Sequence, residues 1–152
     1  MRVDNLYLQR SWPLWEQSKH FELGLILNCA ITDALPPALR IDQLGQLGSQ
    51  QVGCWECNLA DESLIWSGGV YDIFGLPRGS RLDRQEVVRL YKDESRLAME
   101  SLRTYALRHR RGFTIDVEIQ PAVGNSRWMR LIGAPILEGG QVVKLHGLKF
   151  AL

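Results

Sequence analysis

Residues 53–74 read GCWECNLADESLIWSGGVYDIF, and this stretch decides how the rest of the chain is interpreted. Residues 53–59 alternate large apolar with small or polar side chains, which is the period of a half-buried strand. Residues 60–63 are a polar turn cluster ahead of the apolar triplet 64–66, so the two runs predict a hairpin joined by a loop. Ser67 is a residue type that caps helices, and a short helix is expected through Phe74.

The segment that follows predicts short helical turns and then one long helix. Residues 82–91 contain apolar side chains at helical spacing. Asp93 and Glu94 begin the long helix, since acidic side chains are favoured at a helix N-terminus. The helix is expected to run to about Arg111 and to end at Gly112. Its predicted inner face consists of Leu97, Ala98, Leu102, Tyr105 and Ala106.

Three further strands are expected in the last third of the chain. Residues 113–119 alternate apolar and polar side chains, and residues 127–137 and 142–150 form two longer apolar runs. Gly133 and Pro135 interrupt the middle strand, which indicates a bulge or an edge position. Residues 138–141 are a hairpin turn between the last two strands.

This order resembles the PAS domain, in the subgroup with G-x-W in its first strand and an R-W signature in a later one. The resemblance covers about two-thirds of the chain. The matching positions are Gly53, Trp55, Trp66, Ser67, Phe74, Gly75, Gly112, Phe113, Glu118, Gly124, Arg127, Trp128, Gly139 and Gly147. Two positions depart from the family: residues 91–94 replace a common His-Pro-x-Asp, and Gln120 replaces a common Arg. The resemblance implies an α+β fold: a five-stranded antiparallel sheet with short helices and one long helix on one face.

Residues 1–50 do not match this pattern and are expected to form an N-terminal helical extension to a PAS domain at residues 51–152. Apolar side chains at spacings of three and four predict a helix from about Pro13 to Ile31, and residues 39–47 predict a weaker one. The apolar stripe must be buried on the core, in a dimer or against a partner. The extension is therefore expected either to cap the core or to mediate dimerisation.

Composition limits the classes of partner. The net charge is +1 and 45% of the residues are hydrophobic, so nothing favours nucleic acid or an anionic membrane as the main partner. The start lacks the layout of a signal peptide, and no apolar run approaches the roughly 20 residues of a membrane span. We expect a cytoplasmic protein of the bacterial signalling type.

No motif indicates catalysis or a metal site. Cys54 and Cys57 have CxxC spacing, but positions i and i+3 of a strand face opposite ways, so packing is the expected role. The resemblance adds two negative expectations: the cysteine segment of flavin-binding members is absent, and His109 lies too near a helix end for a haem ligand. His20 and His146 are expected to be structural or exposed. The cofactor, if any, stays unassigned.

The resemblance also implies a pocket between sheet and helices that holds a small ligand. The candidates, chosen from inward parity and helix face, are Trp55, Trp66, Tyr71, Phe74, Met99, Leu102, Tyr105, Ile115, Val117, Met129 and Leu131. For each of them plain core packing is the alternative. The expected function is a non-catalytic sensory domain that binds a ligand or partner and relays a conformational change to an output domain or partner protein, as a homodimer. A ligand-free dimerisation or protein-interaction module is the alternative.

Overall fold

The computed structural model describes residues 11–13 and 51–152 of the chain. Its strands are β1 (Ser11–Pro13), β2 (Val52–Asn58), β3 (Leu64–Trp66), β4 (Arg111–Ile119), β5 (Arg127–Glu138) and β6 (Gln141–Ala151). Its helices are α5 (Gly68–Phe74), α6 (Arg84–Val88) and α7 (Asp93–His109). The predicted order of strands and helices after residue 50 is confirmed.

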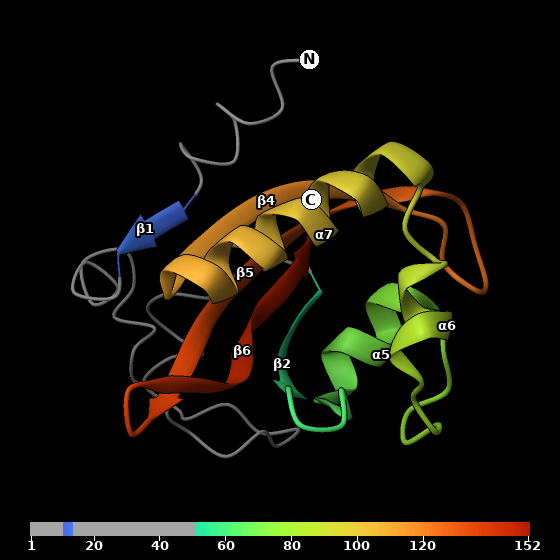
Figure 1. Ribbon diagram of the computed structural model, residues 1–152. Coiled ribbons are helices and arrows are strands. Elements are labelled where there is room, and N and C mark those ends of the chain that lie inside the picture. Colours follow the sequence, from blue (N-terminus) through green and yellow to red (C-terminus); the bar gives the residue numbers. More distant parts are fainter. Residues whose placement is uncertain (1–10, 14–50) are drawn as a thin grey trace, which may run out of the picture.

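The strands form one antiparallel sheet in the order β1-β4-β5-β6-β2-β3. The last strand, β6, lies between β5 and β2, so the two ends of the region 51–152 meet in the centre of the sheet. The helices cover one face, and α7 runs across β4 and β5 (Figure 1). Strands β2 to β6 are the five-stranded sheet that the sequence predicted.

Strand β1 adds a sixth strand that the sequence did not predict. Ser11–Pro13 pairs with residues 111–113 of β4, whereas a helix was expected to begin at Pro13. Pro13 therefore belongs to a strand and does not begin a helix, which corrects that expectation. An edge strand tolerates a residue without a backbone N–H. The remainder of the predicted N-terminal helices lies outside the described residues.

Helix α7 ends earlier than predicted. Its last helical residue is His109, and Arg110 adopts the left-handed conformation with φ 55°. Gly112 belongs to β4, so the predicted stop at this glycine is wrong. Basic side chains in the last turn stabilise this end of the helix through its dipole.

The inner face of α7 also differs from the predicted one. Leu102 and Ala106 are buried as expected, and Met99 joins them. Leu97 is 66% exposed and so does not face the core, which corrects its assignment. Ala98 and Tyr105 are half-buried at the margins of the buried stripe.

Pro135 lies in an interior strand. β5 is flanked by β4 and β6, so the expectation of an edge position is wrong, and the expected bulge is the register shift between Ile136 and Leu137. The pairing of β4 with β5 stops at Phe113 and Gly133. Pro135 therefore sits beyond the end of that ladder, where its missing N–H breaks no β4 hydrogen bond.

Glycine is required at two places in the β5–β6 hairpin for different reasons. Gly139 and Gly140 have φ of 57° and 80°, as in the tight turn that matches strand twist. At Gly147 a Cβ atom would lie 1.8 Å from the carbonyl oxygen of Ile132, so only glycine allows this approach of β6 to β5.

Within the described region, no helix is both long and apolar enough to span a membrane.

Candidate functional site

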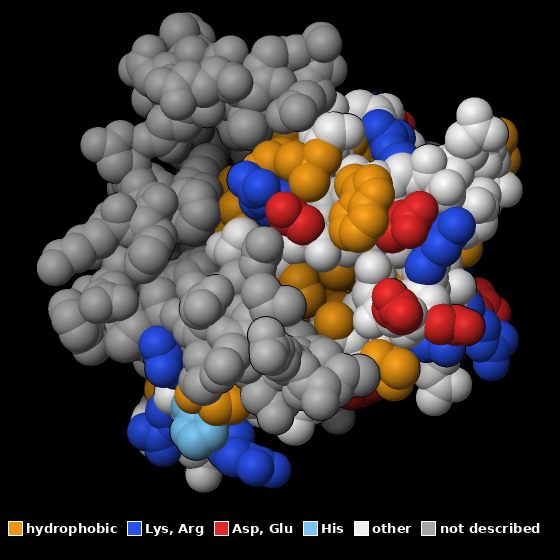
Figure 2. Space-filling model, turned by 90° about the horizontal axis from the view of Figure 1, so that it is seen from above, with side chains coloured by type: hydrophobic (Ala, Val, Ile, Leu, Met, Phe, Trp, Pro, Cys, Tyr) orange, Lys and Arg blue, Asp and Glu red, His pale blue; other side chains and the backbone are white. Residues whose placement is uncertain are grey.

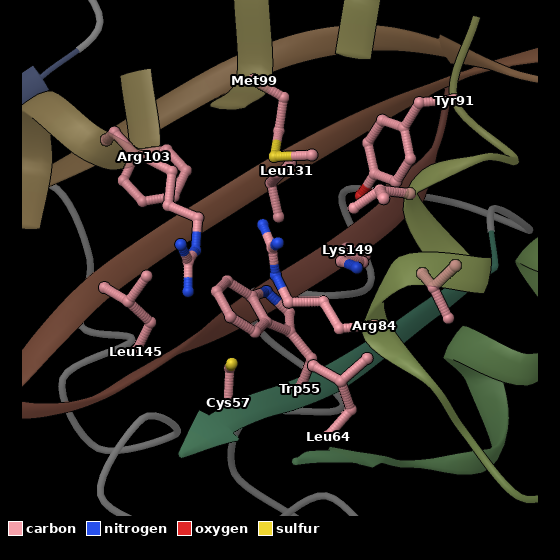
Figure 3. A pocket seen from close by; sticks show the side chains of 13 residues that line it. Trp55, Cys57, Leu64, Arg84, Tyr91, Met99, Arg103, Leu131, Leu145 and Lys149 are labelled. Carbon is pink, nitrogen blue, oxygen red and sulfur yellow. The ribbon is translucent and has the colours of Figure 1, made fainter. Parts of the chain in front are cut away.

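A cavity lies between the sheet and helices α6 and α7 (Figure 3). Its lining comes from every layer of the fold: Trp55, Cys57, Leu64, Arg84, Val87, Val88, Tyr91, Met99, Arg103, Phe113, Leu131, Leu145 and Lys149. About 40 Å³ is open to the centres of water-sized molecules. This corresponds to roughly three waters, or about 90 Å³ of liquid. The cavity is thus small, but it is large enough for a few non-hydrogen atoms.

Trp55 is fixed against the sheet beside the cavity. Its Nε1 donates hydrogen bonds to the carbonyl oxygens of Ile132 at 3.1 Å and Leu148 at 3.3 Å. The register places Trp55 opposite Gly147, which in turn pairs with Gly133. Two glycines side by side leave room for the indole over the backbone, and a Cβ on Gly133 would lie 3.1 Å from Cζ2 of Trp55. The ring is therefore a rigid wall of the cavity.

Arg84 is the first residue of α6, and its side chain lines the cavity. The helix is capped by Asp83, whose Oδ1 accepts a hydrogen bond from the backbone N–H of Gln85 at 2.8 Å. The guanidinium of Arg84 pairs with the carboxylate of Glu100 on α7. The side chain of Arg84 is 14% exposed and that of Glu100 is 39% exposed, so the guanidinium is largely removed from water while its partner reaches the surface.

Arg103 enters from α7, one turn after Met99. Its Nη2 lies 3.6 Å from Oε1 of Glu62, whose side chain is half exposed. That distance is an ion pair without a hydrogen bond, and this buried Nη2 has no hydrogen-bond partner in the described region. Arg103 therefore keeps an unused donor beside the cavity.

Lys149 is the most unusual lining residue. It is 6% exposed, and the described region offers its ammonium neither a salt bridge nor a hydrogen bond. Its Nζ instead lies 5.4, 5.2, 4.9 and 5.9 Å from the ring centroids of Trp55, Trp66, Phe74 and Tyr91. Aromatic faces attract a cation, but more weakly than water or a carboxylate does.

The pKa of Lys149 reflects this environment. Burial disfavours the charged form, and the positive charge of Arg84 adds to the effect, so the pKa falls from 10.5 to about 7. Lys149 can therefore gain or lose its proton near neutral pH. Two other lining groups move the opposite way: burial raises the pKa of the Cys57 thiol and of the Tyr91 phenol, so both stay protonated.

The predicted pocket candidates are divided by the structure into three groups. Trp55, Met99 and Leu131 line the cavity. Trp66 and Phe74 are stacked rings whose centroids lie 5.2 and 4.9 Å from Nζ of Lys149, and Tyr71 packs edge-on against Trp66. The remaining candidates are Leu102, Ile115, Val117 and Met129, which are buried in the core, and Tyr105, which contacts His109.

The charged lining residues were missed from the sequence, although a signal was present. Lys149 and Leu145 share one face of β6, and Met99 and Arg103 are one helical turn apart. Strand parity therefore places Lys149 with an inward residue, and helical spacing does the same for Arg103. Among the other singled-out residues, Cys57 lines the cavity, His146 is buried in β6, and His109 is exposed at the end of α7. Within the described residues, no cluster of His, Cys, Asp or Glu could hold a metal ion.

The described surface carries charges of both signs. Figure 2 shows Lys and Arg side chains mixed with Asp and Glu on the right-hand side of this face, and a second group of Lys and Arg around a histidine at the lower left. The net charge of the whole chain is only +1. The cations in the cavity therefore do not reflect an excess of positive charge over the whole chain.

Comparisons with known proteins find structural relatives. No protein-family model and no curated sequence matches the chain. Among solved structures, the N-terminal domain of a diguanylate cyclase with a PAS/PAC sensor from Marinobacter aquaeolei aligns over 66% of this chain and 94% of its own, with 16% identity and a TM-score of 0.60. A sensory box histidine kinase/response regulator from Burkholderia thailandensis aligns over 72% and 85%, with 17% identity and a TM-score of 0.58.

An RNA-binding light-oxygen-voltage receptor is similar to the same part of the fold. It aligns over 67% of this chain with 16% identity and a TM-score of 0.59, and the chain spans only 29% of that receptor. These identities are low, so the likeness concerns the fold. Together with the strand order, it shows that the chain contains the PAS fold.

Proposed function

We propose that this chain is a sensory signalling domain that binds a small ligand in the cavity between its sheet and helices. The observation that carries the proposal is the buried Lys149 beside an unused donor of Arg103, both lining one cavity. Cationic side chains are rarely buried in a protein core, because removing a charge from water is costly. Buried polar groups normally have hydrogen-bond partners. A ligand would supply the missing partner.

The mechanism is a shift between two populations of the domain. The cavity is lined by α6, α7 and the sheet together, so a ligand contacts the helices and β6 at once. A ligand that prefers one relative position of these layers stabilises that state by its difference in affinity. A homodimer then transmits the change to an output domain or partner protein. Signalling proteins among the structural relatives, a cyclase and a histidine kinase, support this role.

We also propose that the domain is not catalytic. The described lining contains no histidine or carboxylate, which are the usual general acids and bases. Cys57 keeps its proton because burial raises the pKa of its thiol, so it is a poor nucleophile. Lys149 is the one lining amine, and it has no described acid–base partner.

The alternative is an interaction module without a ligand. This alternative is favoured by the small size of the cavity, because apolar core side chains fill most of the space between the sheet and the helices. In that case Lys149 would be a solvated core cation with waters as its partners.

A native mass spectrum of the full chain, as purified, separates the two. An adduct of a few hundred daltons or less that is lost on denaturation supports ligand sensing and gives the mass of the compound. A dimer without an adduct, which stays unchanged in melting temperature across a library of small metabolites, supports the interaction module. A monomer without an adduct or a melting shift contradicts both proposals.

A further inference from the structure

We propose that the ligand of this cavity is a short aliphatic carboxylate, whose anionic end binds between Arg103 and Lys149 and whose tail contacts the apolar wall. This inference rests on the proposed ligand-sensing function and names the chemical class of the ligand. It comes from the charges that the chain places around the cavity.

Three cations from three different elements meet here. Figure 3 shows the charged ends of Arg84, Arg103 and Lys149 directed toward the middle of the cavity from α6, α7 and β6. The same proximity acts on two pKa values: the charge of Arg84 helps to lower that of Lys149, and the charges of Arg103 and Arg84 oppose the rise that burial causes in that of Cys57. Like charges that converge in a site removed from water repel each other, and an anion among them relieves that repulsion.

The described carboxylates neutralise this group only in part. Glu100 is paired with Arg84, and Glu62 lies half in solvent at 3.6 Å from Arg103. Lys149 is left with four aromatic rings and no carboxylate in the described region. One negative charge between Arg103 and Lys149 would complete the set.

The shape of the site favours a carboxylate over a phosphate. A carboxylate is planar and takes the paired donors of one arginine together with an ammonium. The rest of the lining is mostly apolar, with Val87, Met99, Leu131 and Leu145 around the charged ends. A volume of roughly three waters limits the ligand to a carboxylate group with a very short tail. Propionate, with an apolar tail of only two carbons, is a probe at the upper limit of this size.

Binding of such an anion would draw a proton onto Lys149. An adjacent negative charge favours the charged amine and so raises its pKa. The groups that line the cavity with Lys149 are Arg84 from α6, Arg103 from α7, Cys57 from β2 and the Tyr91 phenol. Burial raises the pKa of Cys57 and of Tyr91, whereas the pKa of Lys149 is about 7. Above about pH 7 each bound carboxylate therefore takes up as much as one proton, and affinity falls as the pH rises.

The test is calorimetric titration of the full chain with sodium propionate, with propionamide as the neutral isostere and inorganic phosphate as the other anion. We expect propionate to bind and propionamide to bind at least tenfold more weakly. Repeating the titration at pH 8 in buffers of different ionisation enthalpy should reveal proton uptake. Lys149→Met and Arg103→Gln should each weaken propionate about tenfold to a hundredfold, the range for a charged hydrogen bond.

Lys144→Met is the matched control. Lys144 lies on the same strand, pairs with Glu56 and does not line the cavity, so propionate affinity should not change. Equal binding of propionamide and propionate, or stronger binding of phosphate, overturns the carboxylate assignment. If propionate fails while the native mass spectrum shows a neutral adduct, the ligand class is wrong and the sensing function stands. If no compound binds by either method, the sensing function itself is wrong.

Discussion

The side-chain nitrogen of Lys149 lies 4.9 Å from the centre of the Phe74 ring, inside the core of the domain. Three more aromatic rings surround the same nitrogen at slightly longer distances. A basic side chain therefore occupies a buried position that is usually taken by an apolar one. It has consequences for stability as well as for binding.

The first prediction concerns the dependence of folding on pH. The pKa of Lys149 is about 7 in the folded chain and 10.5 in the reference state, so between these values the unfolded chain binds more protons at this residue. The contribution of Lys149 to the free energy of unfolding therefore rises with pH in this window, by at most about 1.4 kcal/mol per pH unit. Lys149→Met removes the contribution and fills the aromatic cage with a polarisable side chain.

Chemical denaturation of the wild-type and Lys149→Met proteins at pH 6.5, 7.5 and 8.5 measures the effect. The variant should be the more stable at pH 6.5, and its advantage should shrink as the pH rises. Lys144→Met should show no such trend, because its side chain is more than a third exposed. A stability difference between wild type and Lys149→Met that does not change with pH would contradict the assignment of the low pKa.

The second prediction concerns Glu100, which pairs with Arg84. Glu100→Gln leaves the charge of Arg84 uncompensated, so the cavity becomes more positive. Propionate should then bind about tenfold more tightly, by the Coulomb energy of one nearby charge. Glu94→Gln, an exposed change at the start of the same helix, should leave the affinity unchanged. Weaker binding to Glu100→Gln would show that Arg84 must be held by its partner to act.

The third prediction concerns the cap of α6. Asp83→Ala removes the acceptor of the Gln85 N–H and should cost about 1 kcal/mol of stability. Because Arg84 is the next residue, the loss should also weaken propionate binding. Asp83→Asn keeps a side-chain oxygen in the capping position and should behave like the wild type in both measurements. Denaturation and calorimetry on the two variants check this, and an Asp83→Asn as weak as Asp83→Ala would point to the charge instead of the cap.

The fourth prediction concerns the closest backbone contact in the sheet. A Cβ at Gly147 would lie 1.8 Å from the Ile132 carbonyl oxygen, so Gly147→Ala must displace β6 from β5. We expect a loss of about 3 kcal/mol or more, at the upper end for overpacking. Gly79→Ala is the comparison: its Cβ would meet nothing, and its φ of 79° alone should cost about 1 kcal/mol. Similar melting temperatures for the two variants would contradict this account of Gly147.

The sheet and the long helix could be predicted from the sequence because their signals are local and periodic. β4 shows the clearest case, with alternation along residues 113–119 that matches its burial pattern. The failures occurred where tertiary structure decides. Pro135 is tolerated inside the sheet because the pairing of β4 with β5 ends before it, and the end of α7 is set by Arg110 in a left-handed conformation that glycine usually adopts.

The cavity was harder to predict than the fold. The candidates were chosen as apolar residues, since burying a cation is unfavourable in general, and Trp55, Met99 and Leu131 were found in this way. The same rule excluded Arg84, Arg103 and Lys149. Strand parity puts Lys149 on the same face as Leu145, but parity does not tell a buried lysine from one that reaches solvent. The rings that surround Lys149 come from β2, β3, α5 and the segment before α7.

The most direct test of the account is the pKa of Lys149 in the full chain, with and without propionate. NMR of selectively labelled lysine side chains, assigned with the Lys149→Met variant, follows its titration. The account predicts a pKa of about 7 in the free protein and a clearly higher value with propionate bound. A pKa near 10.5 that propionate does not change would contradict it, because Lys149 would then be neither buried in the cavity nor the partner of an anion.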